Sequence, residues 1–96
     1  MKAVIIAYNE ALSEELMEIL EKNGVEGYTL WTKALGKGIA SGPHLMTTVW
    51  PVANNVILCV VEEAVASRLL EEVRSLRREF SFEGVKAFQF SIEDMT

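Results

Sequence analysis

The hydrophobic positions of this chain recur with two different periods, which separate strands from helices. Residues 2–8 form an apolar, β-branched run that is too short for a helix, so they predict the first strand. Residues 27–35 carry aromatic and β-branched side chains, and residues 55–61 are almost wholly apolar, which predicts the second and third strands. Residues 85–92 alternate, with aromatic and polar side chains on opposite faces, and predict the fourth.

Two other stretches have the helical period. Near residues 11–23, leucine and isoleucine recur between glutamates, with Asn9 or Ser13 as the cap and Gly24 as the end. A second helix begins at Glu62 or Glu63. Its predicted buried stripe comprises Val65, Leu69, Val73, Leu76 and Phe80. Near its C-terminal end, where cations complement the helix dipole, stand Arg74, Arg77 and Arg78.

The resulting order is βαββαβ within one domain of 96 residues. Two right-handed βαβ crossovers in that order place both helices on one face of a four-stranded antiparallel sheet. The sequence therefore predicts an α+β, ferredoxin-like fold.

Both faces of the first and third strands are apolar, which a two-layer monomer does not require. Ala3 and Ile5 alternate with Val4 and Ile6, and residues 56–61 are apolar at every position. A monomer would leave a large apolar patch in water, so we expect a second copy of the chain to cover it.

Between the second and third strands lies a predicted loop, about residues 36–54, that contains several glycines and prolines. From residue 38 to residue 61 no residue is charged, yet these breakers exclude a membrane helix. The loop holds His44 together with Met46 and Trp50. Such side chains suit a protein partner, packing onto the protein's own assembly, or a soft metal bound by His44 and Met46.

Composition excludes several classes of function. The net charge of −5 has the wrong sign for nucleic-acid binding. The one cysteine, Cys59, cannot form an intramolecular disulfide and is predicted to pack in the core, and residues 1–30 lack a secretory signal pattern, so we expect a cytoplasmic protein. Neither a nucleophile with a nearby base nor a P-loop is present, so we do not expect an enzyme.

Several segments, in order and with near-gapless spacing, resemble the PII signal-transduction family. Lys33-Ala34-Leu35-Gly36-Lys37 is similar to the family's Lys-Gly-Phe-Gly-Arg, and Lys86-Ala87-Phe88-Gln89-Phe90 to its Lys-Ile-Phe-Val-Phe. The segments 2–8, 24–30 and 56–73 also match in pattern. The resemblance covers nearly the whole chain except the loop.

The resemblance implies a homotrimer that binds adenine nucleotides such as ATP or ADP between subunits. It also implies that the loop, residues 37–54, controls a partner such as a transporter or an enzyme. Carried over by position, Gly27 and Thr29 lie near the adenine, while Gly36 and Lys37 lie near the phosphates at the loop base. Gly84 and Lys86 complete the implied site, with Lys86 coming from the neighbouring subunit's last strand.

The chain departs from the family pattern in the segment that holds phosphate. Where the family has Gly-x-Gly-Asp-Gly-Lys, this chain has Phe82-Glu83-Gly84-Val85-Lys86, so Val85 replaces a glycine and Glu83 adds negative charge. The sequence given also ends before the family's arginine-bearing C-terminal extension, and its loop lacks the tyrosine that is uridylylated in better-known members. We therefore expect weak nucleotide binding.

Three functions follow from these observations. The first is a PII-like sensor that binds a small effector and controls a partner. The second is a trimer that responds to divalent or heavy metals, as CutA-like proteins do, through His44. The third is an interaction module without a ligand.

Overall fold

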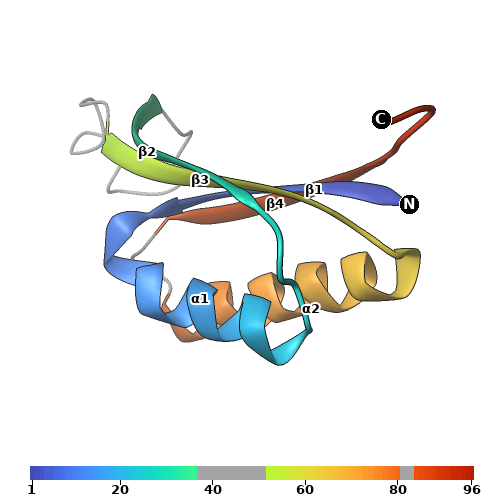
Figure 1. Ribbon diagram of the computed structural model, residues 1–96. Coiled ribbons are helices and arrows are strands. Elements are labelled where there is room, and N and C mark those ends of the chain that lie inside the picture. Colours follow the sequence, from blue (N-terminus) through green and yellow to red (C-terminus); the bar gives the residue numbers. More distant parts are fainter. Residues whose placement is uncertain (37–51, 81–83) are drawn as a thin grey trace.

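The computed structural model describes residues 1–36, 52–80 and 84–96, and within them one sheet carries helices on one of its faces (Figure 1). The strands are β1 (Lys2–Asn9), β2 (Thr29–Gly36), β3 (Val52–Val61) and β4 (Val85–Ser91). A 3₁₀ turn, η1 (Glu10–Leu12), leads into α1 (Ser13–Lys22), and α2 (Glu63–Glu79) follows β3. This order confirms the predicted ferredoxin-like α+β fold.

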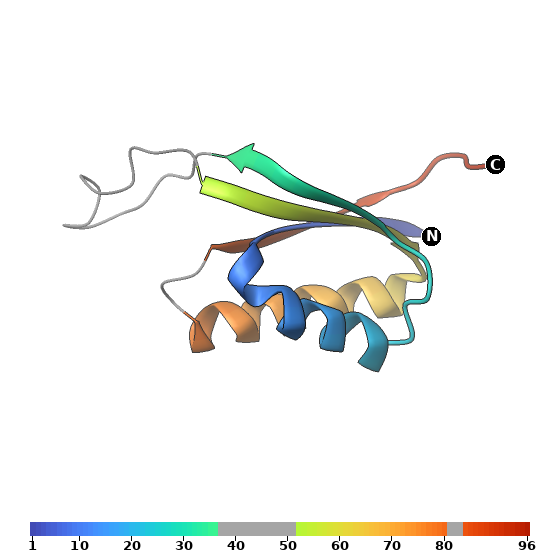
Figure 2. The ribbon, with the colours of Figure 1, turned by 60° about the vertical axis from the view of Figure 1, so that its left-hand side comes forward.

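The described strands form an antiparallel sheet in the order β2-β3-β1-β4. In the centre of the sheet Ile5 pairs with Leu58 on one side and with Phe88 on the other. Figures 1 and 2 show α1 and α2 on the same face of the sheet. The two chain ends lie at one end of the molecule, and the ends of β2 and β3 that bound residues 37–51 lie at the other (Figure 1).

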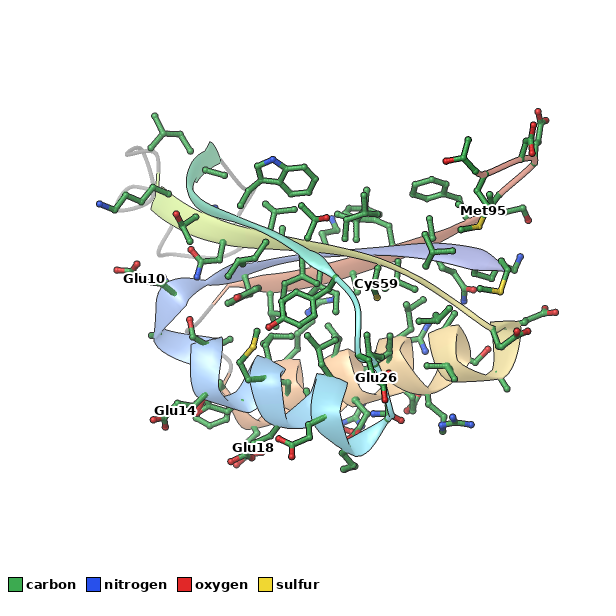
Figure 3. All side chains as sticks on the ribbon, viewed as in Figure 1. Glu10, Glu14, Glu18, Glu26, Cys59 and Met95 are labelled. Carbon is green, nitrogen blue, oxygen red and sulfur yellow. The ribbon has the colours of Figure 1, made fainter. Side chains whose placement is uncertain are left out.

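The core lies between the sheet and the helices, where alternate strand residues meet the inner stripes of α1 and α2. From the central strands, Ile6, Ile57 and Cys59 are fully or almost fully buried there, and Figure 3 shows Cys59 on this side of the sheet. From the helices the core receives Leu16, Ile19, Leu20, Ala66, Leu69, Val73 and Leu76. This confirms most of the predicted stripe of α2; its outer members, Val65 and Phe80, are only partly buried, and Ala66, absent from the prediction, is fully buried.

Local hydrogen bonds explain where α1 begins and ends. The side chain of Asn9 accepts a hydrogen bond of 2.9 Å from the backbone N–H of Ala11, so it caps η1, and the predicted first helical turn is a 3₁₀ turn. Ser13 instead donates its hydroxyl to the carbonyl of Glu10 at 2.7 Å. Gly24 has φ +73°, a left-handed conformation that favours glycine and ends helices, as predicted.

The ends of the predicted loop belong to strands. Pairing of β2 with β3 continues through Leu35 with Ala53 and Gly36 with Val52, so β3 begins three residues earlier than predicted. The sequence underestimates the sheet here because glycine and asparagine are poor strand formers, whereas cross-strand hydrogen bonding holds them in the ladder. Residues 37–51, with His44 and Lys37, lie outside the described residues.

The register of β2 against β3 slips once. Trp31 pairs with Val56 and Ala34 with Asn54, so β2 has one more residue than β3 between these pairs. Lys33, inside this β-bulge, has φ +58°. A lysine in the left-handed region costs roughly 1–2 kcal/mol, which the surrounding ladder must offset.

A polar cluster joins the C-terminal end of α1 to the middle of α2. Lys22 forms an ion pair with Glu72 at 2.8 Å, and the side-chain amide of Asn23 donates to Glu72 at 3.2 Å and to the carbonyl of Ile19 at 2.8 Å. Arg68 donates from Nε to the amide oxygen of Asn23 at 3.2 Å. We call these four side chains, Lys22, Asn23, Arg68 and Glu72, the helix clamp.

Candidate functional site

The described residues of the predicted ligand site fall into two groups. Thr29 is the first residue of β2, with Gly27 two residues before it, and Gly36 is the last, about 23 Å from Thr29 at about 3.3 Å per residue. Gly84 directly precedes β4, and Lys86 is the second residue of that strand. All of these residues except the half-buried Gly36 are exposed to solvent.

These two groups lie on opposite edges of the sheet. β3 and β1 separate β2 from β4, which at about 4.8 Å per strand puts the two edges about 14 Å apart. Thr29 and Lys86 therefore cannot contact the same small ligand within one chain. A site that contains both groups needs the β2 edge of one copy and the β4 edge of another.

Gly36 fits its position because the neighbouring strand leaves no room for a side chain. A Cβ atom added at Gly36 would lie 2.8 Å from the amide nitrogen of Asn54, closer than real Cβ contacts. At Gly27 and Gly84 an added Cβ would meet nothing within 4 Å. Of these three glycines, only Gly36 has a neighbour, the Asn54 side chain, that would have to move to admit a Cβ.

The backbone before β4 is tied to the first helical turn. The N–H of Asn9 donates to the carbonyl of Gly84 at 2.8 Å, while the side chain of Asn9 caps η1. One residue thus fixes both the entry to α1 and the backbone just before β4.

The structure explains why Val85 stands where the family resemblance leads us to expect a glycine. Its side chain is 7% exposed and packs into the core on the helix side. Lys86 faces the other side of the sheet, and its ammonium lies 5.8 Å from the centre of the Phe88 ring, a cation–π contact. The first residues of β4 therefore place one side chain in the core and one cation on the outer face.

The face of the sheet opposite the helices is apolar, as predicted. Its middle row consists of Ile5, Leu58 and Phe88, which are paired in register across β3, β1 and β4. Phe88, Phe90 and Trp31 are each 49% exposed. We call this surface the outer face; its further members are Ala3, Ala7, Val56 and Val60.

A polar hollow of about 620 Å³, which the sequence did not predict, lies where β1 meets η1 and the bulge of β2. Its lining residues are Asn9, Glu10, Ala11, Ser13, Thr32, Lys33 and Asn55. Asn55 is 7% exposed, and its amide lies 3.4 Å from the Ser13 hydroxyl and 3.5 Å from that of Tyr8. The one available signal was an asparagine at an inward position of an otherwise apolar strand.

The remaining candidates for chemistry are inert or lie outside the described residues. Burial raises the pKa of the Cys59 thiol, so it stays protonated near neutral pH and serves as core packing, as predicted. Within residues 1–36, 52–80 and 84–96, histidine, cysteine and carboxylate side chains form no group of three that could hold a metal. No helix in that part of the chain is both long and apolar enough to cross a membrane. Because His44 lies elsewhere, its role as a metal ligand stays a prediction.

The fold was compared with those of known proteins. Structures of PII-like proteins resemble the fold. A PII-like signaling protein from Thermus thermophilus has a TM-score of 0.64 and 28% identity, covering 93% of this chain and 83% of that one. CPII from Thiomonas intermedia, bound to ADP and bicarbonate, has a TM-score of 0.66 and 26% identity, covering 97% and 88%.

A second structure of CPII, bound to ADP, AMP and bicarbonate, has a TM-score of 0.68 at 24% identity, covering 99% of this chain and 94% of that one, and supports the fold. No curated protein matches the chain. The sequence model of the family described as Nitrogen regulatory protein P-II matches residues 1–96, the whole sequence given. The chain therefore belongs to the P-II family of nitrogen regulatory proteins.

Proposed function

We propose that this chain is a homotrimeric sensor that binds an adenine nucleotide in the clefts between its protomers. One observation carries the proposal: the two groups of predicted ligand residues lie on opposite edges of the sheet, so a complete site requires two copies. In a ring of three, the β2 edge of each protomer meets the β4 edge of the next. This arrangement makes three equivalent sites.

The outer face supplies the driving force for the ring. Burying apolar surface contributes about 25 cal/mol per Å², and this face presents large side chains such as Leu58, Phe88 and Phe90. Its strands pair in register, so the surface is continuous across the central strands rather than scattered. Packing three such faces together removes the apolar patch from water while leaving the helices outside.

The nucleotide is proposed from the family and from CPII, whose structure contains ADP and bicarbonate. Gly27 and Thr29 of one protomer would lie near the base. Gly36 is about 23 Å from Thr29 along β2, so Gly36 and Lys37 would approach the phosphates from another copy. Gly84 and Lys86 of the next protomer would close the site. Because the side chain of Val85 is committed to the core, the backbone before it is less free to wrap a phosphate than a glycine segment. We expect dissociation constants in the high micromolar range, about −5 to −6 kcal/mol.

The proposed output is control of a partner protein, such as a transporter or an enzyme, through residues 37–54. This part of the proposal rests on family membership and on the uncharged run with Met46 and Trp50. The protein would act in the cytoplasm and regulate rather than catalyse. Ligand state in the cleft would act on the partner through Gly36, which borders both the site and the loop.

Calorimetric titration with ATP, ADP and cyclic AMP, each with and without bicarbonate, tests the proposal. We expect binding that weakens at least tenfold in Lys37→Ala and in Lys86→Ala, because each removes a charged phosphate contact. Lys2→Ala is the control, because Lys2 begins β1, whereas Lys86 pairs near the other end of that strand. This substitution removes the same charge and should leave binding unchanged.

Nucleotide binding that survives both site substitutions would disprove the assigned phosphate contacts. Absence of nucleotide binding, together with a Cu²⁺ or Ni²⁺ signal lost in His44→Ala, would instead support the metal-responsive trimer.

A further inference from the structure

The arginines and the lysines of this chain lie in different parts of the sequence. All four arginines occur in α2, whereas the five lysines occur elsewhere. Arg74, Arg77 and Arg78 alone line a surface hollow of about 320 Å³ near the C-terminal end of α2. We call these three residues the arginine flank.

The arginine flank faces away from α1. Glu72 marks the side of α2 that meets α1, through its ion pair with Lys22. At about 100° per residue, Arg74 and Arg78 point roughly 200° and 240° from Glu72, and Arg77 roughly 140°. Because α2 packs on β4 and β1, with α1 at its other side, the flank borders the β4 edge of the molecule.

Within residues 1–36, 52–80 and 84–96, the positive charge of the flank is only partly neutralised. Arg74 pairs with Glu71 at 3.0 Å, and both side chains are more than half exposed. Arg78 donates to the hydroxyl of Ser75 at 3.0 Å, a neutral partner. In the described part of the chain no ion pair involves Arg77 or Arg78.

Local helix energetics do not account for this cluster. Cations in the last turn complement the helix dipole, which explains one or two basic residues there. Arginines at spacings of three and four, such as Arg74 with Arg77 and with Arg78, repel one another by about 0.2–0.5 kcal/mol per pair. Lysine would complement the dipole equally well, whereas the guanidinium fork matches a carboxylate in two contacts.

We propose that the arginine flank is a docking surface for an acidic segment of a partner protein. The hollow is open, and its lining consists of exposed side chains, so it suits an extended chain of carboxylates that gains from several contacts at once. The net charge of −5 repels any polyanion, but a short acidic segment contacts only the flank, whereas a nucleic acid would extend over the negatively charged remainder of the surface. The surface consists of α2 side chains and includes no residue of the proposed nucleotide site.

The position of the flank fits such a role. The C-terminal end of α2 lies at the same end of the molecule as the ends of β2 and β3 that bound residues 37–51 (Figures 1 and 2). It belongs to the helix layer, on the side opposite the outer face, so packing of the outer faces does not cover it. Because it borders the β4 edge, it would lie beside the contact with the next protomer. A partner that engages residues 37–51 would therefore find a cationic surface at the same end.

Fluorescence anisotropy with a labelled octaglutamate peptide tests the proposal, with octaglutamine as the neutral probe. We expect the intact protein to bind octaglutamate but not octaglutamine, and affinity to fall as salt rises. Arg77→Gln should weaken binding about two- to fivefold, as expected for one exposed ion pair. Lys2→Gln produces the same net charge at the far end of the molecule and should leave affinity unchanged.

The triple variant Arg74→Gln, Arg77→Gln, Arg78→Gln should lose binding by about tenfold or more, and circular dichroism establishes that it remains folded. Equal affinity in Arg77→Gln and Lys2→Gln would overturn the proposal, because attraction would then depend on overall charge alone. Tighter binding of polyphosphate or of anionic phosphatidylserine vesicles than of octaglutamate would overturn the assignment of the partner class.

Discussion

At the residue scale, Gly36 shows most clearly how packing limits which side chain a position can accept. It is the last described residue before position 37, and the amide of Asn54 occupies the space that a Cβ would need. Because Asn54 itself has an interaction in the structure, moving its side chain aside has a cost. The glycine therefore belongs to the packing of β2 against β3 as well as to the proposed ligand site.

Gly36→Ala should lower the free energy of unfolding by about 1 kcal/mol, because the new methyl group displaces the Asn54 amide. Gly27→Ala is the matched control: its added Cβ meets nothing within 4 Å, so stability should stay the same or rise slightly. Urea unfolding of the two variants measures the difference. Equal stability of the two would mean that Asn54 relaxes at no cost.

At the element scale, the periods of the sequence predicted the strands and helices but not how their ends are held. Alternation and helical spacing depend on burial, so they identify the core faces of β1, β3 and α2 directly. The 3₁₀ form of the first turn, the bulge of β2 and the helix clamp depend on particular hydrogen bonds, several of them between residues far apart in sequence. Such bonds leave no periodic signal, and the hollow around Asn55 was missed for the same reason.

The helix clamp gives the pairing of α1 with α2 a dependence on pH. The hydrogen bond from Lys22 lowers the pKa of Glu72, partial burial opposes this, and the bond from Asn23 lowers the pKa further. Since the folded pKa lies below that of the unfolded carboxyl, about 4.3, the stabilisation is present above that pH. It is lost as the pH falls through the lower, folded value.

Glu72→Gln should therefore be less stable than the parent chain by about 0.5 kcal/mol at pH 7, and the difference should disappear as the pH falls below the lowered pKa of Glu72. Thermal unfolding between pH 3 and pH 7 measures it. Glu71→Gln is the control, because its pair with Arg74 lies within α2 and both side chains are mostly exposed, so its effect should be smaller. A difference that persists at pH 3 would show that Glu72 acts by packing rather than by charge.

At the scale of the whole molecule, the hydrophobic pattern predicted more apolar strand surface than a single chain can bury. The core between helices and sheet uses one face of each strand. The outer face remains apolar, and its aromatic side chains Trp31, Phe88 and Phe90 are half exposed. The sequence predicted this excess because both faces of residues 2–8 and 55–61 are apolar. The hydrophobic pattern alone did not predict that the predicted ligand residues fall on opposite edges of the sheet, which requires the sheet order, although the family resemblance implied a site shared between subunits.

Light scattering at micromolar concentration should give a particle of about 32 kDa, three times the 10.7 kDa of one chain. Ile5→Asp should disperse the trimer or unfold it, because burying an unpaired carboxylate in the outer face costs several kcal/mol. Ser67→Asp introduces the same charge on the exposed side of α2 and should leave the mass unchanged. A monomer in the parent chain would also remove the basis for sites shared between protomers.

The bulge in β2 has a consequence for how this protein can diverge. In a regular strand every second residue shares a face, so Lys33 and Leu35 would lie on the face of Trp31. The extra residue in the bulge shifts this alternation, and Ala34 and Gly36 lie on that face instead. The bulge therefore places Gly36, the last residue of β2, on the face of Trp31, which it would not share in an unbulged strand. Insertions after Gly36 would leave the face on which β2 ends unchanged. Deletion of Thr32 would remove the bulge and place Gly36 on the opposite face of the sheet. The number of residues after Gly36 and the face on which β2 ends can therefore change independently, because the second depends on the bulge at Lys33.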